Sequence, residues 1–439
     1  MFPDAGGGRK GLGVAAGGKL LERGFGREVV RPDTGFFADG LAQHGHQCEF
    51  VPCRCRGRSQ PPRRRNHGRL CCCELAAGGV HQAAMRFIGS VIEKLQRHPK
   101  RLVFPEGTEP RILQAARQFY SLRLGVPILL GNRAEIKEVA AALNISLEGI
   151  RILNPAESEE LDNFARRFEV LRRSKGMKSY EAREAMLQPN YFGAMMVAMH
   201  QADGFVSGAN LNVGSVLRPL FQIIKVAPQT TTASSCLVME VEDSRFGEQG
   251  VLFMADCGVI PEPNVEQLAD IAVSTAQLAR HLLGVRPRVA LLSFSTKGSS
   301  AHPSVGRVQA ATALAAQKAA ARGLDAIFDG EMQVDAALVP EIAARKCPDG
   351  PIVGNANVLI FPDLNSGNIA SKLVRHVARA NAYGQILLGL DRPAADVSRG
   401  SNAHDILGVA AIVGVQAVDY DILYPGAGRS LPGEDESSG

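Results

Sequence analysis

The chain has 439 residues, 45% of them hydrophobic and 21% charged, so it is too long for one small domain and can bury sizeable cores. Its formal charge is +5. Residues 1–84 contain 13 Lys/Arg and 7 Asp/Glu, a local +6 that leaves −1 for residues 85–439. This near-neutral main body argues against a broad nucleic-acid-binding surface. The longest strongly apolar stretches, such as 407–418, fall short of the roughly 20 residues needed to cross a membrane.

Residues 1–84 combine glycine runs, the basic clusters RCRGR and PPRRRNHGR, and the triplet Cys71–Cys73, without a sustained helical or strand period. We expect this extension to be disordered or mis-assigned, as if GC-rich DNA had been translated outside its frame, with Met85 as the true start. A basic nucleic-acid tail and a zinc site are the alternatives. The zinc ligands would be His44, His46, Cys48, Cys53, Cys55 and His67.

Cysteine is rare in the main body, where Cys236 and Cys257 lie in apolar, strand-like runs. We interpret them as reduced core thiols, and the start of the chain is too rich in glycine to be a secretory signal. These features predict a cytoplasmic location.

Beyond residue 85, short β-rich apolar runs alternate with longer amphipathic stretches, which is typical of repeated βα units. In chain order, strands are expected at 101–106, 126–131, 151–155, 204–208, 251–257, 288–295, 326–330, 358–364 and 385–389. Helices are expected at 112–122, 157–172, 265–282, 305–321, 336–344 and 403–415. The sequence therefore predicts an α/β fold with a largely parallel sheet, in which ligands bind beyond the carboxyl ends of the strands.

Three polar loops follow predicted strands. Ser295, Thr296 and Lys297 follow one strand, Asp329 ends another, and Asn365 follows a third. Any one such loop is explained by turn and helix-capping preferences alone. Three at strand ends favour a phosphate-binding cleft, because backbone N–H groups and helix N-termini attract anions. Neither a Walker A loop nor a GxGxxG fingerprint is present to indicate a standard nucleotide site.

The segment DVSRGSNAHDI (396–406) leads from a loop into an apolar helix and carries a hydroxyl, a guanidinium and a carboxylate. Arg399 offers a planar fork that matches phosphate or carboxylate, and Ser398 can donate a hydrogen bond to an oxyanion. Asp405 lies at the edge of the apolar helix, where burial disfavours its charged form and makes it a usable base. The alternative is purely structural: Asp405 at a helix N-terminus and Ser398–Arg399 in a surface turn.

Further segments are specific when taken together with DVSRG and Asp405. They are RLVFPEGTE (101–109), KGM (175–177), YFGAMMV (191–197), ADGFVSGA (202–209), LRPLFQIIK (217–225), LLSFSTKGSSAHP (291–303), DGEMQVDAALVPE (329–341) and ANVLIFPDLNSGNIASKL (356–373). Residues from about 85 to 425 thereby resemble the phosphate acetyltransferase/phosphate butyryltransferase family.

The resemblance implies reversible transfer of an acetyl or other short acyl group between coenzyme A and inorganic phosphate. It places Ser398, Arg399 and Asp405 on the active-site segment, Arg218 on the phosphate-side arginine and Arg172 on a second arginine. Asp405 would remove the thiol proton, and Ser398 and Arg399 would stabilise the oxyanion. Coenzyme A is then a co-substrate, and no other cofactor, metal, nucleic acid or membrane is expected.

The resemblance also implies a homodimer and a fold of two α/β domains that flank a cleft, similar to isocitrate and isopropylmalate dehydrogenases. The first domain would comprise 85–228 plus 388–425 and the second 229–387, with 426–439 as a disordered tail. Asn210 and Asn212 depart from the family's usual text, which leaves the choice between acetyl and butyryl open. Two other functions stay open: an acetyl-coenzyme A-sensing module like the carboxyl-terminal part of some malic enzymes, and a decarboxylating dehydrogenase.

Overall fold

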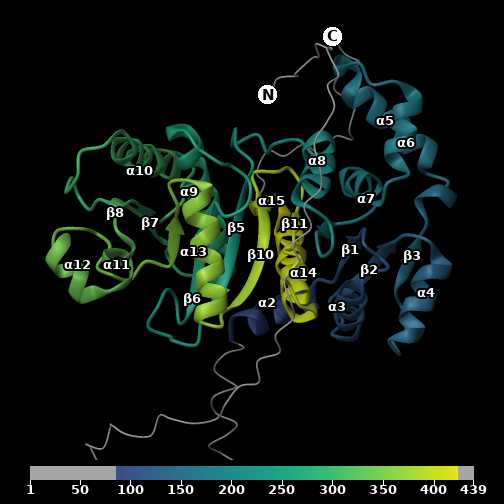
Figure 1. Cartoon of the computed structure of the whole chain (residues 1–439), viewed down its shortest axis with the longest axis horizontal. Coiled ribbons are helices and arrows are strands. Elements are labelled where there is room, and N and C mark those ends of the chain that lie inside the picture. Colours follow the sequence, from purple (N-terminus) through teal and green to yellow (C-terminus); the bar gives the residue numbers. More distant parts are fainter. Residues whose placement is uncertain (1–85, 424–439) are drawn as a thin grey trace, which may run out of the picture. The chain divides into compact units, whose positions relative to one another are not determined.

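The computed structural model describes residues 86–423, so the predicted extension 1–84 and tail 426–439 lie outside the described residues. The described strands are β1 Lys100–Phe104, β2 Gly125–Leu130, β3 Arg151–Leu153, β4 Gly204–Ser207, β5 Ser234–Glu240, β6 Val251–Ala255, β7 Arg288–Leu292, β8 Ile327–Met332, β9 Val358–Ile360, β10 Asn381–Leu388 and β11 Ala394–Asp396. They form one 11-stranded sheet in the order β3-β2-β1-β4-β11-β10-β5-β6-β9-β7-β8 (Figure 1).

Helices precede, connect and follow these strands. They are α2 Arg86–Arg97, α3 Pro110–Ser121, α4 Arg133–Ala142, α5 Leu161–Arg172, α6 Ser179–Met186, α7 Pro189–Ala198, α8 Val213–Ile223, α9 Val265–Leu283, α10 Pro303–Ala321, α11 Val334–Leu338, α12 Pro340–Lys346, α13 Leu364–Val377, α14 Ala403–Val418 and α15 Tyr420–Leu423, with short 3₁₀ turns η1 Pro155–Glu157 and η2 Arg173–Lys175.

Parallel pairing predominates, which confirms the expected α/β fold. The strands β3-β2-β1-β4-β11 are parallel neighbours at one end of the sheet. Strands β6, β9, β7 and β8 are parallel neighbours at the other. Between them, β10 pairs antiparallel with both β11 and β5, and β5 pairs antiparallel with β6.

The sheet therefore joins two groups of strands through β11 and β10. The β11–β10 ladder is short, because its register holds only Ile386 opposite Ala395 and Leu387 opposite Ala394. Chain segments from before 228 and after 388 supply the β3-to-β11 group, and the segment between them supplies almost all of the other. One sheet thus runs through both of the parts that the sequence predicts as domains.

Helix α14 forms the centre of the first group's core, and it lies beside β10 and β11 in Figure 1. Every residue from Asp405 to Gln416 is buried, and the helix packs on α2, α3, β4 and β10. Close approach requires a glycine at 408, because a Cβ there would lie 2.4 Å from the ring of Tyr383. The expected helix at 403–415 is confirmed, and its burial fixes the loop before it against the sheet.

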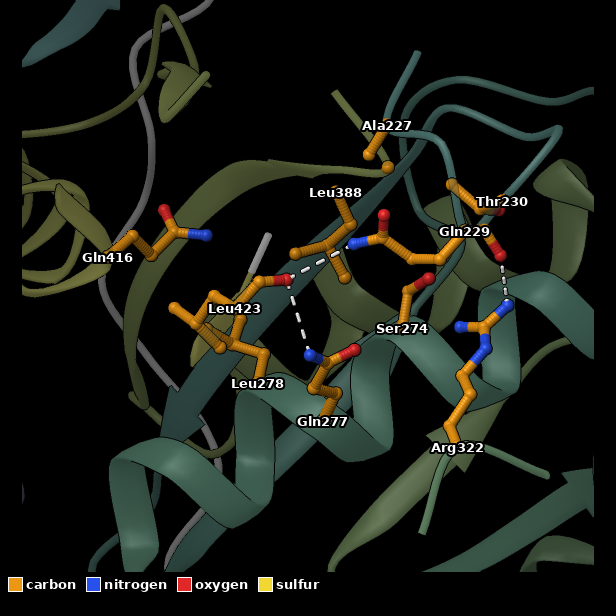
Figure 2. Close-up of a pocket in the computed structure, with 11 residues that line it drawn as sticks. Ala227, Gln229, Thr230, Ser274, Gln277, Leu278, Arg322, Leu388, Gln416 and Leu423 are labelled. Atoms are coloured by element: carbon orange, nitrogen blue, oxygen red, sulfur yellow. Dashed lines mark hydrogen bonds between the residues drawn. The ribbon is translucent and has the colours of Figure 1, made fainter. Parts of the chain in front are cut away.

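A small cavity lies between the end of β10, α9 and the last described residues (Figure 2). Its volume is about 30 Å³, which suits one water molecule rather than a substrate. The side-chain amides of Gln277 and Gln229 donate to the Leu423 carbonyl at 3.2 and 3.4 Å, and Arg322 donates to the Gln229 carbonyl. These hydrogen bonds hold α15 against α9 and belong to the scaffold.

Candidate active site

Two adjoining cavities lie at the carboxyl ends of β1, β4 and β11. Cavity A has a volume of about 660 Å³ and is lined by Asp396, Ser398 and Arg399 from β11 and the loop after it, among others. Cavity B has a volume of about 1070 Å³ and is lined by Glu106 after β1 and by Arg218 on α8. Leu211 lines both, so the two cavities are neighbours. This is the position that parallel α/β sheets use for ligands.

The wall of cavity A carries several basic side chains. Lys372, Arg375 and His376 line it from α13, and Arg399 lines it from the loop after β11. Arg399 is exposed, and within residues 86–423 its guanidinium has no hydrogen-bond or ion-pair partner. A planar guanidinium left available in this way suits a phosphate or carboxylate group of a ligand.

The loop that carries Ser398 and Arg399 is fixed from behind by Arg111 on α3. Its guanidinium donates to the carbonyl oxygens of Arg399 at 2.6 Å, Ser401 at 2.9 Å and Ala209 at 2.5 Å. Glu109, the N-cap of α3, holds Arg111 by an ion pair of 2.7 Å. Arg111 therefore connects the loop after β11 to the loop after β4. No sequence pattern singles out this residue.

Asp405 lies in the first turn of α14, next to cavity A but outside its lining. Its residue is 2% exposed, and its Oδ2 is 2.7 Å from Nη2 of Arg375. The same oxygen accepts from the backbone N–H of Asn402, which completes a capping box with that residue. Arg375 lines cavity A and also donates to the Gly400 carbonyl at 2.9 Å. The sequence predicts only burial at Asp405, whereas the structure also pairs it with Arg375.

Arg218 and Arg172 both act on Tyr191, which lines cavity B. Burial raises the pKa of the Tyr191 hydroxyl, and the positive charges of Arg218 and Arg172 oppose that rise. Arg218 lines cavity B itself, whereas the Nε of Arg172 is buried without a hydrogen-bond partner within the described residues. The charges of both arginines thus act on Tyr191, at the cavity that adjoins Arg399.

The other predicted binding residues gather elsewhere. Ser295 Oγ donates to Glu331 at 2.9 Å, Thr296 Oγ1 donates to Gln333 at 3.3 Å, and Lys297 forms an ion pair with Asp329. These contacts hold the loop after β7 against strand β8 and the residue that follows it. Among residues 86–423, neither cavity A nor cavity B is lined by Ser295, Thr296, Lys297 or Asp329. Asn365 lies in the first turn of α13, beside Leu364, which does line cavity A.

Two carboxyl groups, those of Glu106 and Asp396, lie near each other at the boundary between the cavities. Glu106 accepts hydrogen bonds from the backbone N–H groups of Gly208, Ala209 and Asn210 at 2.6–2.8 Å. Asp396 lines cavity A, and burial, followed by repulsion from the Glu106 carboxylate, raises its pKa to about 8. Both residues fall inside segments that the sequence analysis quoted, RLVFPEGTE and DVSRG, but a strand-end carboxylate has no distinguishing pattern of its own.

Metal clusters and membrane-spanning helices are both absent from the described part of the chain. No group of three or more His, Cys, Asp or Glu side chains there could hold a metal ion. The six candidate zinc ligands lie outside the described residues. Among the described helices, none is long and apolar enough to span a membrane.

The fold and the two cavities define an α/β ligand-binding protein with a cationic wall at its strand ends. A family profile described as phosphate acetyl/butaryl transferase matches residues 86–414, and the chain belongs to this family.

Curated relatives and solved structures agree with this assignment. A protein of Thermoanaerobacterium thermosaccharolyticum named phosphate acetyltransferase is 47% identical over 333 residues, which are 76% of this chain and 100% of the relative. A Treponema pallidum protein of the same name is 41% identical over 337 residues, 76% of this chain and 99% of the relative. The EutD phosphotransacetylase from Staphylococcus aureus superposes with a TM-score of 0.69 at 37% identity, covering 76% of this chain and 99% of that one.

Proposed function

We propose that this protein catalyses reversible transfer of an acetyl group between coenzyme A and inorganic phosphate. The observation that carries the proposal is the available guanidinium of Arg399 beside Ser398 in cavity A, in a chain whose relatives at 41–47% identity are named phosphate acetyltransferase. Coenzyme A carries several phosphate groups, and the cationic wall formed by Lys372 and Arg375 suits them. Cavities A and B together offer room for two substrates.

In the proposed mechanism, phosphate and the acyl carbonyl meet at Ser398 and Arg399. The tetrahedral intermediate carries a new oxyanion, which the Ser398 hydroxyl and the Arg399 guanidinium stabilise. Arg218 and Arg399 hold the phosphoryl oxygens, and Arg172 adds positive charge near Tyr191. Holding two substrates in line supplies much of the remaining rate.

Asp405 is proposed as the base toward the coenzyme A thiol. A thiol of pKa about 8.5 is mostly protonated at neutral pH, so its attack on acetyl phosphate, which forms the thioester C–S bond and releases phosphate, benefits from a base. In the opposite direction the same carboxyl returns the proton to the departing thiolate. Asp405 is paired with Arg375, whose guanidinium also donates to the Gly400 carbonyl, and both Arg375 and Gly400 line cavity A. The thiol would therefore have to approach along Gly400 to reach the carboxylate.

Several finer expectations are part of the same proposal. Coenzyme A is the only co-substrate besides phosphate, without a further cofactor. Segments 85–228 plus 388–425 and 229–387 act as two domains, and the short β11–β10 ladder supports a junction there. Ser295, Thr296, Lys297, Asp329 and Asn365 as substrate-binding residues, a homodimer and a cytoplasmic location stay predictions.

The test is to mix the full chain with inorganic phosphate and, in separate reactions, acetyl-, propionyl- or butyryl-coenzyme A, and to detect the acyl phosphate by mass spectrometry. We expect acetyl phosphate, with the acetyl donor used at the highest kcat/KM. Binding of acetyl-coenzyme A without any acyl phosphate would instead indicate a sensing module. Preference for the butyryl donor would overturn the acetyl assignment and leave acyl transfer intact.

A further inference from the structure

Asp396 is a buried carboxyl without a partner at the edge of cavity A. It is the last residue of β11, opposite Ser207 of β4 in the register, and it is 5% exposed. Within residues 86–423 its side chain makes no hydrogen bond or ion pair. Position 208, which follows Ser207, must be glycine, because a Cβ there would lie 2.1 Å from Oδ1 of Asp396. Gly208 thus leaves room for the Asp396 carboxyl, and no group of residues 86–423 forms a hydrogen bond or ion pair with it.

The donors nearest to Asp396 are already used by Glu106. Its carboxylate accepts from the N–H groups of Gly208 at 2.6 Å, Ala209 at 2.8 Å and Asn210 at 2.7 Å, and from the Ser207 hydroxyl at 3.2 Å. Such a set of donors suits an ionised carboxylate, which is acceptor-only. The Glu106 carboxylate therefore lies near Asp396, with its own oxygens already hydrogen-bonded.

These surroundings favour a neutral Asp396. Burial, followed by the charge of Glu106, raises the pKa of Asp396 to about 8 from its ordinary value of 3.8. The other charged groups around the cavity are Arg399 on the loop after β11, Lys372, Arg375 and His376 on α13, and Asp405 on α14, which is paired with Arg375. At neutral pH, Asp396 thus presents an O–H donor rather than a negative charge.

We propose that protonated Asp396 donates a hydrogen bond to the phosphate or acyl phosphate bound beside Ser398 and Arg399. This inference rests on the proposed function, which brings an anion into cavity A. An O–H donor to an anionic oxygen makes a short, charge-assisted hydrogen bond, whereas an ionised Asp396 would repel the same oxygen. Asp396 is therefore a proton-dependent binding residue: it admits phosphate when protonated and disfavours it when ionised.

The experiment measures binding of inorganic phosphate to the full chain by calorimetry between pH 7 and 9, without acetyl-coenzyme A. The protonated fraction of a group of pKa about 8 falls about tenfold over this range, so the wild-type Kd for phosphate should rise about tenfold. Asp396→Asn keeps an N–H donor and cannot ionise. It should bind phosphate within a few-fold of wild type at pH 7, and the ratio of wild-type to variant Kd should rise about tenfold by pH 9, which cancels the ionisation of phosphate itself.

Asp325→Asn is the matched control, because Asp325 is exposed and pairs with Arg286 outside both cavities. It should keep the wild-type pH dependence. A Kd ratio between wild type and Asp396→Asn that stays constant from pH 7 to 9 would overturn the proposal. If Asp396→Asn does not fold, a wild-type Kd that does not rise over this range overturns it equally well.

The outcome is separable from that of the proposed function. Acetyl phosphate formation with a constant Kd ratio rejects the role of Asp396 alone. A wild-type chain that forms no acyl phosphate rejects the proposed function, whatever the pH dependence of phosphate binding. A loss of more than about 100-fold in turnover by Asp396→Asn at pH 7, together with a Kd ratio that stays constant from pH 7 to 9, would assign Asp396 to proton transfer instead and overturn its role as a donor.

Discussion

Removing Arg375 should leave a buried charge without its partner, and the structure sets the size of the effect. The Asp405 side chain is 3% exposed, and its Oδ2 lies 2.7 Å from the Arg375 guanidinium. Breaking a buried pair by removing one partner typically costs about 3–5 kcal/mol. Because the Arg375 side chain keeps 19% exposure, water screens part of the pair, and we expect the lower end, about 3 kcal/mol, for Arg375→Met. In a folded chain of this size, this corresponds to a fall in Tm of roughly 4 °C.

A double-mutant cycle tests this reasoning. Thermal unfolding is followed by circular dichroism for wild type, Arg375→Met, Asp405→Asn and the double variant. The double variant should regain about half or more of the stability lost by Arg375→Met, because a neutral amide replaces the unpaired carboxylate. Arg345→Met, on the exposed side of α12, serves as the control and should shift Tm by about 1 °C or less. A wild-type Tm for Arg375→Met, or a double variant no more stable than Arg375→Met, would refute the buried-pair account.

Three further predictions concern the cavity walls. In steady-state assays, Arg218→Ala should raise the KM for phosphate about 10- to 100-fold, because one charge-assisted contact is lost. The KM for acetyl-coenzyme A should stay nearly unchanged, and equal effects on both substrates would contradict this role. Asp396→Asn should gain stability over wild type by up to about 1.4 kcal/mol per pH unit between about pH 4 and 8. The reason is that the folded state binds the Asp396 proton more tightly than the unfolded chain does, so stability is lost as pH rises toward a pKa of about 8, and a Tm difference independent of pH would contradict it. Gly208→Ala should lower Tm by several degrees and weaken phosphate binding, because the new Cβ would lie 2.5 Å from the Val397 carbonyl oxygen and Gly208 has a φ of +110°. The control Gly306→Ala, which has open space around it in α10, should be neutral or stabilising.

The elements with strong periodicity could be predicted from the sequence, and those without it could not. Helix α14 was expected because its apolar residues are continuous, and the structure buries it. Strand β11 has three residues, too few for a pattern. Helix α13 is rich in Ser, Asn and Gly at its start, which favours a loop locally, yet Asp363 caps it by accepting from the N–H of Ser366 at 2.9 Å.

The candidate site could be located in part, because one segment carries Ser398 and Arg399 together. The order of strands in the sheet could not be predicted. Ser295 follows β7 and Asp329 lies on β8. Four strands of the sheet, β10, β5, β6 and β9, lie between β11 and these two strands. Three loops at strand ends therefore do not converge on one place. Likewise, the partner of Asp405 is Arg375, thirty residues before it on another helix, and no local pattern connects the two.

The most direct test of the central claim compares acetyl phosphate formation from acetyl-coenzyme A and phosphate by wild type and by Asp405→Asn, at saturating substrate. The proposed mechanism predicts that wild type forms acetyl phosphate and that Asp405→Asn lowers kcat about 100- to 10,000-fold, with both KM values little changed. Wild-type turnover in Asp405→Asn would contradict the role of Asp405 as the base, and no acetyl phosphate from wild type would contradict acyl transfer at this site.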